Sequence, residues 1–275
     1  MTQSIESFIE TIVRKTITEK FADTNIIDSK RRTVIAANWK MNMSLETAGS
    51  LITQLADTTY SNTVVVCPPY PYLYPVKLLL NQSTSNIQLG GQNVHEEDKG
   101  AHTGDISAEM LKDVGCEHVI IGHSERRMIG ETDELVNNKV VKALEKKLTP
   151  IICIGETAEQ YDQGLTKEVV SSQIQTALTG VTDLSDIVIA YEPVWAIGTG
   201  KSATAEQAQD IHEYIRSTIE KSHGVLADEV PILYGGSVKA KNAEEFSKMK
   251  DIDGVLVGGA SLNAEEFKSI IQAFA

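Results

Sequence analysis

From Thr33 onward, short runs of Val, Ile and Leu alternate with longer segments of helical periodicity, and each run ends in a polar or Gly/Pro-rich turn. We count eight such runs, at residues 34–38, 64–67, 87–90, 119–121, 151–154, 187–190, 232–234 and 255–257. Nearly continuous apolar runs are typical of parallel strands buried on both faces, and the helical segments supply the crossovers that parallel pairing requires. Eight units in about 240 residues predict a (β/α)8 barrel rather than an open doubly wound sheet, which usually has fewer strands for its length.

Residues 1–32 stand outside this repeat, so we expect two parts: an extension over 1–32 and a barrel domain over 33–275. Within the extension, apolar residues recur at helical spacing from Ile5 to Ile17, with charged and polar residues between them. This pattern predicts an amphipathic helix that packs on the barrel or on a partner subunit. A membrane-surface role is the weaker interpretation because acidic residues interrupt the polar face. The sequence does not indicate what the extension does.

Charge and cysteine content exclude several classes of function. The chain of 275 residues carries a formal net charge of −13 and no strong basic patch, which argues against a nucleic-acid partner. A small anionic substrate can still bind to local backbone amides and one or two Lys residues. The three cysteines show no metal-site spacing, and no apolar stretch is long enough to span a bilayer. We therefore expect a cytoplasmic protein that has no disulfide framework, no metal and no membrane partner.

In barrels of this class the working residues lie just past the carboxyl ends of the strands. Several polar or glycine residues occupy those points: Asn38, Lys40, His123, Glu125, Cys153, Glu156, Glu192, Gly235, Gly236, Ser237, Gly258 and Gly259. Glu192 ends an apolar run and precedes Pro193. We expect this position to be partly dehydrated, which tends to raise a carboxyl pKa toward the range of a general base. The residues from Pro193 to Thr199 fit a short lid with a hinge at each end. As structural alternatives, Glu192 could form an ion pair or cap a helix.

His123 immediately precedes a predicted helix, whose positive end would lower the imidazole pKa and keep the ring neutral, able to donate a hydrogen bond. A purely structural hydrogen bond is the alternative. Lys40 follows the first strand two residues after Asn38, which suggests positive charge that faces an anionic substrate. The glycine pairs at 235–236 and 258–259 expose backbone N–H groups, and a short helix near Ser261 would add its N-terminal dipole. Together they predict a phosphate site, whereas either pair alone could be a plain tight turn.

Seven sequence motifs occur in the order in which a known family has them. They are Asn-Trp-Lys-Met-Asn at 38–42, Gly-Gln-Asn at 91–93, Gly-His-Ser-Glu-Arg-Arg at 122–127, Cys-Ile-Gly-Glu at 153–156, Tyr-Glu-Pro-Val-Trp-Ala-Ile-Gly-Thr-Gly at 191–200, Tyr-Gly-Gly-Ser-Val at 234–238 and Gly-Gly at 258–259. From about Thr33 to the C-terminus, the chain resembles the triosephosphate isomerase family. The resemblance implies an intramolecular aldose–ketose isomerase of glycolysis and gluconeogenesis. It would interconvert dihydroxyacetone phosphate and D-glyceraldehyde 3-phosphate through an enediolate, without cofactor or metal.

The resemblance also implies a role for each matching residue, in keeping with the family's division of labour between carboxylate base, neutral imidazole and closing loop. Glu192 would move the proton between C1 and C2, and His123 would polarise the carbonyl. Lys40 and Asn38 would stabilise the negative charge, while Glu125 would orient this side of the site. Gly198, Ser237, Gly258 and Gly259 would bind the phosphate, with Tyr234 helping to hold the lid shut and Cys153 a packing residue.

Thr103 lies in a segment that resembles the family's third-loop tip, which reaches into a neighbouring subunit, so the resemblance implies a homodimer. Two features depart from the family pattern. The segment after Arg127 is one residue shorter than the usual spacing, so the start of the following helix is expected to shift while the site survives. The extension has no counterpart in the pattern and could alter oligomer geometry.

Two other functions stay open at this point. A barrel aldolase would form a Schiff base on a strand-end lysine such as Lys40, although nothing in the sequence indicates the desolvated pocket that this chemistry needs. A catalytically retired relative would act as a binding or scaffold protein through its extension, and it would require a damaged site, which the sequence does not show.

Overall fold

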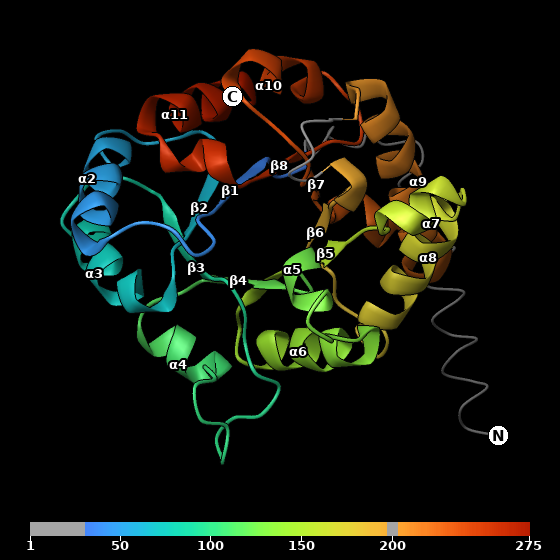
Figure 1. Ribbon diagram of the computed structural model, residues 1–275, viewed down its shortest axis with the longest axis horizontal. Helices are drawn as coiled ribbons and strands as arrows, with labels where there is room; N and C mark the ends of the chain where they lie inside the picture. Colours follow the sequence, from blue (N-terminus) through green and yellow to red (C-terminus); the bar gives the residue numbers. More distant parts are fainter. Residues whose placement is uncertain (1–30, 197–202) are drawn as a thin grey trace, which may run out of the picture. The chain divides into compact units, whose positions relative to one another are not determined.

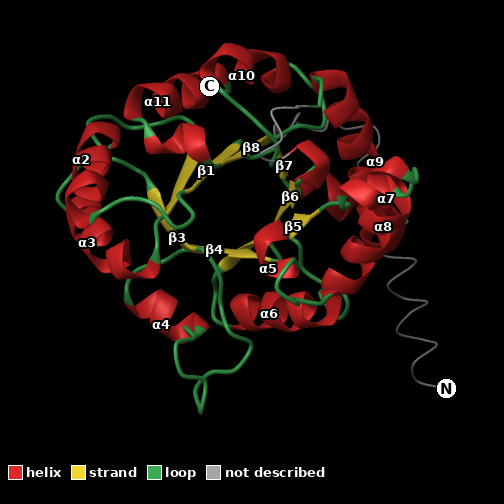
Figure 2. Ribbon diagram, viewed as in Figure 1, coloured by secondary structure: helices red, strands yellow, loops and turns green. Residues whose placement is uncertain are grey.

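A computed structural model describes residues 31–196 and 203–275. Eight parallel strands close into a barrel in which each strand pairs with the next along the chain and the eighth pairs with the first (Figures 1 and 2). The strands are β1 (Val34–Asn38), β2 (Thr63–Cys67), β3 (Gln88–Gly91), β4 (His118–Ile121), β5 (Thr149–Ile154), β6 (Val188–Tyr191), β7 (Ile232–Tyr234) and β8 (Gly254–Val257). The predicted fold is therefore confirmed, and the predicted strands agree with the observed ones to within two residues at each end.

The helices surround the barrel and connect consecutive strands (Figure 2). They are α2 (Leu45–Leu55), α3 (Tyr70–Asn81), α4 (Ala108–Asp113), α5 (Ser124–Arg127), α6 (Asp133–Glu145), α7 (Ala158–Asp162), α8 (Thr166–Ala177), α9 (Ala205–His223), α10 (Ala240–Ser247) and α11 (Ala264–Ala273), with 3-10 turns at Val194–Ala196, Gly224–Glu229 and Gly259–Leu262. Several begin at Ser or Thr caps. Thr204, for example, accepts a hydrogen bond from the Gln207 amide and starts α9.

Side chains alternate between the two faces of each strand, which divides the core into two parts. In β1, Val34 and Ala36 belong to a small cluster inside the barrel, whereas Ile35 and Ala37 belong to the large cluster between strands and helices. The inner cluster also contains residues from six other strands: Val65, Cys67, Ile120, Ile151, Cys153, Val188, Ala190, Leu233 and Leu256. Branched side chains thus fill the barrel interior, as expected for this architecture.

The division of the chain remains a prediction, although residues 32–275 form a compact unit on their own. The predicted amphipathic helix and Gly198 lie outside the described residues. All three cysteines are buried and free of disulfides. Among the helices that the structure describes, none combines the length and apolar character needed to cross a bilayer.

Candidate active site

The alternation of the strands explains which side chains reach the mouth of the barrel. Two residues beyond the inward-facing Ala36 of β1 lies Asn38, and two beyond the inward-facing Ala190 of β6 lies Glu192. Both side chains are buried, with Asn38 5% and Glu192 3% exposed. They line one cavity of about 770 Å³ together with residues from the carboxyl ends of β1, β4, β7 and β8. The strand pattern therefore delivers a polar amide and a carboxylate into the same pocket.

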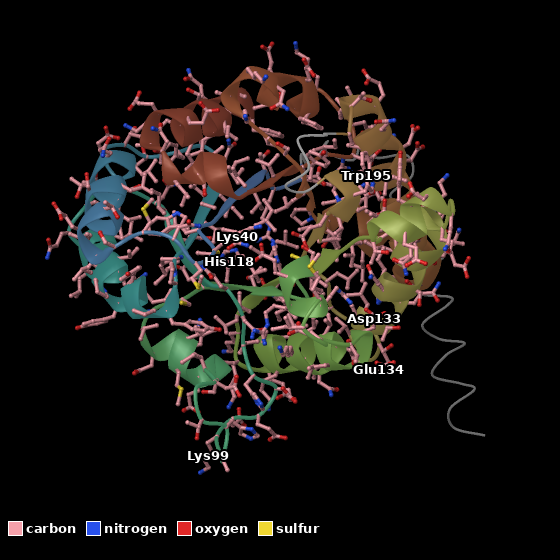
Figure 3. The ribbon with its side chains drawn as sticks, viewed as in Figure 1. Lys40, Lys99, His118, Asp133, Glu134 and Trp195 are labelled. Carbon is pink, nitrogen blue, oxygen red and sulfur yellow. The ribbon has the colours of Figure 1, made fainter. Side chains whose placement is uncertain are left out.

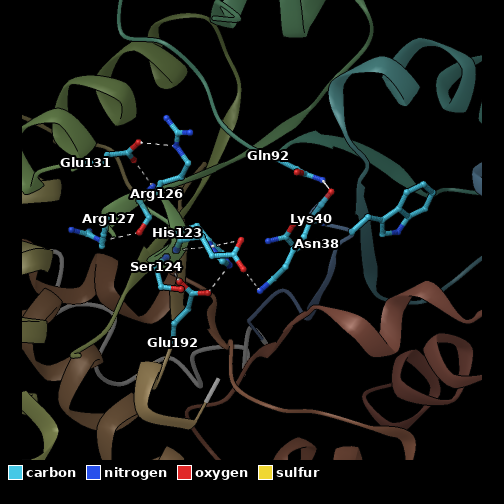
Figure 4. Close-up of polar contacts among 12 residues, drawn as sticks. Asn38, Lys40, Gln92, His123, Ser124, Arg126, Arg127, Glu131 and Glu192 are labelled. Atoms are coloured by element: carbon cyan, nitrogen blue, oxygen red, sulfur yellow. Dashed lines mark hydrogen bonds and ion pairs between the residues drawn. The ribbon is translucent and has the colours of Figure 1, made fainter. Parts of the chain in front are cut away.

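The carboxylate of Glu192 is held between two neighbours on the loop after β4 (Figure 4). Its Oε2 accepts a hydrogen bond of 2.9 Å from the Ser124 amide, and its Oε1 lies 2.9 Å from Nε2 of His123. Residues 68 or 69 positions apart in the sequence thus meet directly. The carboxylate and the imidazole are close enough for a proton to pass between them or through a molecule placed against both.

The pKa of Glu192 departs from the value expected from sequence. Burial raises it, as predicted, but the charge and hydrogen bond of His123, the Ser124 amide and the charge of Lys40 outweigh burial and hold the pKa below its ordinary value. The prediction of a raised pKa is therefore wrong for this arrangement. The contribution from charge on His123 exists only while that ring is protonated, whereas the two hydrogen bonds and the Lys40 charge act on the carboxylate in either case.

Hydrogen bonding decides which nitrogen of a neutral His123 ring carries the proton. His123 caps α5, and its Nδ1 accepts a hydrogen bond of 3.1 Å from the Glu125 amide. A nitrogen that accepts a hydrogen bond carries no proton, so the neutral ring has its proton on Nε2, where it points at Glu192. The predicted helix after His123 is present but only four residues long. We therefore attribute the position of the proton on the neutral ring to the Glu125 amide rather than to the dipole of a long helix.

The turn that carries His123 is fixed from both sides. Gly122 adopts a φ of 72°, which glycine tolerates best, and its amide donates to the carboxylate of Glu131 at 3.1 Å. Arg127 donates from Nε to the Gly122 carbonyl at 2.7 Å and also forms an ion pair with Asp133 (Figure 4). Glu131 in turn forms a buried ion pair of 2.6 Å with Lys139. The segment after Arg127, predicted to be one residue shorter than the family pattern, thus supplies a carboxylate to the His123 turn.

Lys40 has a strained backbone, with a φ of 52° in the region that L-residues rarely adopt. Its amide donates to Oδ1 of Asn38 at 3.0 Å, and its carbonyl accepts from the side chain of Gln92 at 2.9 Å (Figure 4). The ammonium group lies 2.7 Å from Oε1 of Glu125, whose other oxygen is 3.7 Å from Nδ1 of His123. Glu125 thus lies between Lys40 and His123, and Figure 3 locates Lys40 over the barrel mouth.

The opposite wall of the cavity consists of two glycine pairs and a serine. Gly235, Gly236 and Ser237 follow β7, and Gly258 and Gly259 follow β8. The predicted short helix is present, but it is a 3-10 turn over Gly259–Leu262, two residues earlier than Ser261. The wall is open at Gly258, because a Cβ added there would meet only the Lys40 side chain, at 3.6 Å. The described part of the predicted phosphate site therefore borders the same cavity as Glu192, His123 and Lys40.

Gly235 gives room to the Glu192 carboxylate, because a Cβ at this position would lie 2.9 Å from Cγ of Glu192. We expect Gly235→Ala to lower kcat by about tenfold, since even a sub-ångström displacement of a reacting group is costly. Steady-state kinetics check this result. Gly49→Ala is the matched control because its methyl would meet only one side-chain atom, at 3.7 Å. Equal kinetics for the two variants would contradict the steric argument.

A second buried carboxylate anchors the start of the predicted lid. Glu156 is fully buried and accepts hydrogen bonds from Trp195 Nε1 at 2.9 Å, from the Tyr191 hydroxyl at 3.2 Å and from Thr166 at 3.2 Å. Burial raises the pKa of Glu156, and these hydrogen bonds offset part of the rise. At the other end of the segment, burial raises the pKa of Tyr234 to about 12, with a backbone contact to Ala203 acting against it. Residues 197–202 lie outside the described part of the chain.

Sequence reasoning missed three features of this site: the Ser124 amide on Glu192, the Gln92 side chain on Lys40 and the anchoring role of Glu156. Gln92 and Glu156 belong to recognised motifs, but their partners are distant in sequence and could not be inferred from spacing. Cys153 is fully buried in the inner core, and burial raises its thiol pKa well above the ordinary value. This environment fits the packing role predicted for it.

Comparison with known proteins gives one consistent result. A family model described as "Triosephosphate isomerase" matches residues 33–274. Proteins named triosephosphate isomerase are similar over 88% of this chain: one from Alkaliphilus oremlandii (strain OhILAs) is 51% identical with 99% of its own length covered, one from Hydrogenovibrio crunogenus (strain DSM 25203 / XCL-2) is 50% identical with 98% covered, and one from Chlorobium luteolum (strain DSM 273 / BCRC 81028 / 2530) is 49% identical with 99% covered.

Proposed function

The chain belongs to the triosephosphate isomerase family, and we propose that Glu192, His123 and Lys40 carry out its reaction in the cavity described above. The protein interconverts dihydroxyacetone phosphate and D-glyceraldehyde 3-phosphate. The observation that carries the assignment of residues is the contact of 2.9 Å between the Glu192 carboxylate and Nε2 of His123, with the Lys40 ammonium group lining the same cavity. A base, a hydrogen-bond donor and a cation are the groups that an enediolate intermediate requires.

In the proposed mechanism, the substrate's reacting carbons lie against Glu192, which removes the proton from C1 of the ketone. His123 donates its Nε2 proton toward the carbonyl oxygen, where negative charge develops. Lys40 and Asn38 stabilise that charge, and both side chains line the cavity. Glu192 then returns the proton to C2, while the C1 hydroxyl gives its proton to Nε2 of His123, which leaves an aldehyde at C1 and a hydroxyl at C2 and restores both side chains. Burial raises the pKa of Glu192, and its contacts with His123, Ser124 and Lys40 lower it, so we expect a substrate that excludes water and interrupts the His123 contact to make the carboxylate a stronger base.

We assign the phosphate to the wall formed by Ser237, Gly258 and Gly259, with Gly198 completing it from the lid. The first three residues line the cavity, and Lys239 adds a further positive charge there. Backbone N–H groups of glycine can approach a phosphate closely because no side chain intervenes. The lid beginning at Pro193 would exclude water and keep the enediolate from losing its phosphate. Its anchor on Glu156 supports this arrangement.

A coupled assay of the purified chain tests the proposed function. We expect turnover of D-glyceraldehyde 3-phosphate without added metal or cofactor, and no labelling of Lys40 when borohydride is added with substrate. Trapping on Lys40 would instead indicate the aldolase alternative, and absence of turnover would indicate the scaffold alternative. The ion pair of Lys40 with Glu125 argues against the uncharged lysine that Schiff-base chemistry needs.

We further propose that the chain forms a homodimer through the loop that contains Thr103. This loop, between β3 and α4, projects away from the barrel, with Lys99 near its end (Figures 1 and 3), and Thr103 is exposed. A cavity of about 170 Å³ beside Asn38 and Lys40 offers a place for a side chain from a second copy. Met41, Met128 and Ile129 are exposed apolar residues that an interface would cover.

Thr103→Arg is expected to shift the protein from dimer to monomer and to lower kcat by at least about tenfold, because the Asn38–Lys40 segment would lose its support and misplace catalytic groups. Analytical ultracentrifugation measures the mass and the coupled assay measures turnover. Lys248→Ala, at an exposed position on α10's C-terminal end, is the control and should remain dimeric. A Thr103→Arg protein that stays dimeric and fully active would rule out this loop as the interface.

We propose a reducing, cytoplasmic setting for the protein, supported by three buried cysteines that form no disulfide.

A further inference from the structure

A second lysine, besides Lys40, lines the catalytic cavity. Lys239 lies two residues beyond Ser237, immediately before α10. Ser237 and Lys239 are exposed, whereas Val238 between them is buried. Alternate side chains of an extended chain point to the same side, and Lys239 has extended backbone angles, with φ at −136° and ψ at 164°. The Lys239 side chain therefore leaves the chain on the same side as Ser237, in the wall that we assign to the phosphate.

Hydrogen bonds fix the backbone from which Lys239 projects. The Lys239 amide donates to Oδ1 of Asn242 at 2.7 Å, and Nδ2 of Asn242 donates to the Ser237 carbonyl at 3.3 Å. The Lys239 carbonyl accepts from the amides of Asn242 and Ala243, at 3.1 and 3.0 Å, where α10 starts. One asparagine side chain thus ties Lys239 to Ser237. The base of the lysine side chain is therefore held at a fixed place beside the proposed phosphate wall.

The two lysines of the cavity differ in their partners. Lys40 lies 2.7 Å from a carboxylate oxygen of Glu125, whereas Lys239 forms no ion pair with any carboxylate in the part of the chain that the structure describes. Glu192 and Glu266 contribute two negative charges to the same lining. Two lysines and two glutamates thus cancel among the described lining residues. If Lys239 were uncharged, the sum of these charges would be negative.

The charge of the whole chain opposes the approach of a phosphate ester. The formal net charge is −13, and a sugar phosphate carries about two negative charges near neutral pH. A charge at the rim of a binding site acts mainly on association, because it attracts the ligand before contact, and salt screens this attraction. Lys239 has the sign, the exposure and the position for such an effect. A positive charge at this place would offset part of the repulsion.

We propose that Lys239 captures the phosphate dianion of the substrate and thereby determines how efficiently this acidic protein takes up a phosphorylated three-carbon sugar. The inference rests on the proposed function, to which it adds a binding residue that touches no reacting atom. The alternative is that Lys239 is an ordinary solvated lysine whose charge the substrate does not sense. The two interpretations differ in how kcat/KM depends on the charge at position 239 and on ionic strength.

Steady-state kinetics of the full-length chain with D-glyceraldehyde 3-phosphate, at ionic strengths of about 0.01 M and about 1 M, test the proposal, because the screening length falls from about 30 Å to about 3 Å. Lys239→Gln should lower kcat/KM about fivefold at low ionic strength, the effect of one charge on a dianion roughly 8 Å away in water. Lys239→Glu should lower it about 25-fold, and Lys239→Arg should keep it. These losses should arise mainly in KM and nearly vanish at high ionic strength.

Two control variants separate the local charge from the net charge of the chain. Lys248 follows the other end of α10, pairs with Glu244 at 2.8 Å and does not line the cavity, so Lys248→Gln should stay within about twofold of the unchanged chain. Glu266→Gln removes a negative charge from the lining, and its amide oxygen can still accept from the Ala240 amide, as the carboxylate does at 2.8 Å. It should therefore raise kcat/KM at low ionic strength.

The outcomes that would overturn the proposal concern Lys239→Gln. They are an unchanged kcat/KM, a loss of the same size at both ionic strengths, an equal loss in Lys248→Gln, or a fall in kcat that Lys239→Arg shares, which would indicate a structural role. Absence of turnover by the unchanged chain would instead refute the proposed function, and this inference with it. Failure of the inference alone would therefore leave an active enzyme that does not respond to the charge at position 239.

Discussion

Glu192→Gln is expected to lower kcat by about a hundredfold to ten-thousandfold, the usual contribution of a positioned general base. Glutamine has nearly the same shape, so its carbonyl oxygen can still accept the Ser124 hydrogen bond of 2.9 Å and the buried side chain still fills its place. An amide cannot accept the substrate's proton, however. The loss should therefore occur in kcat, with a smaller change in KM, in both directions of the reaction.

Two further variants make the test specific. Glu192→Asp keeps a carboxylate but withdraws it by one methylene, and it should show an intermediate loss because the base no longer reaches the reacting carbon well. Gly49→Ala, at a position that does not line the cavity, should keep the kinetics of the unchanged chain. A folded Glu192→Gln protein with more than about a tenth of the original turnover would refute the assignment of the base, since a positioned general base typically contributes about a hundredfold or more.

Arg216→Met is expected to lower the free energy of unfolding by about 3–5 kcal/mol, the largest stability effect that we predict for a single substitution. Arg216 is 8% exposed and lies 2.7 Å from a carboxylate oxygen of Asp251 and 2.7 Å from one of Asp253. Its Nη1 also donates to the carbonyls of Ala227 and Val230. Methionine would fill part of the volume, but two buried carboxylates would lose their guanidinium partner.

Urea unfolding followed by circular dichroism measures this effect as a lower transition midpoint. Lys248→Met is the matched control, since it removes an ion pair whose side chains are 67% and 73% exposed. Such a surface pair contributes about 0–1 kcal/mol, so the midpoint should scarcely move. A loss below about 1 kcal/mol for Arg216→Met would mean that burial of this cluster cancels its own attraction, a balance known for buried ion pairs.

Much of the fold could be predicted because the signals are local. Each strand is a run of apolar residues, and the alternation within a strand decides which side chain faces the interior. That rule, extended two residues beyond Ala36 and Ala190, leads to Asn38 and Glu192 at the mouth of the barrel. The match of chemical motifs then added the family, and the comparisons support the same conclusion for residues 33–274.

What could not be predicted depends on contacts between distant segments. The direction of the Glu192 pKa results from His123, Ser124 and Lys40, which approach it from two other strand ends. The positive φ of Lys40 likewise requires Asn38 and Gln92 to hold the backbone, and no local pattern indicates such strain. Sequence reasoning considered burial alone for Glu192 and therefore obtained the opposite direction.

The alternation of inward and outward residues also determines where this chain can change length. One residue inserted or deleted between Val188 and Glu192 would exchange the two faces of β6. The Glu192 side chain would then point toward the helices, and an apolar side chain would point into the cavity. The segment after Arg127, predicted to be one residue shorter than the family pattern, lies between α5 and α6, beyond the strand and beyond His123, where a change of length moves no strand side chain to the other face. We therefore expect changes of length to be tolerated in the connections and not in the strands that end at the catalytic groups.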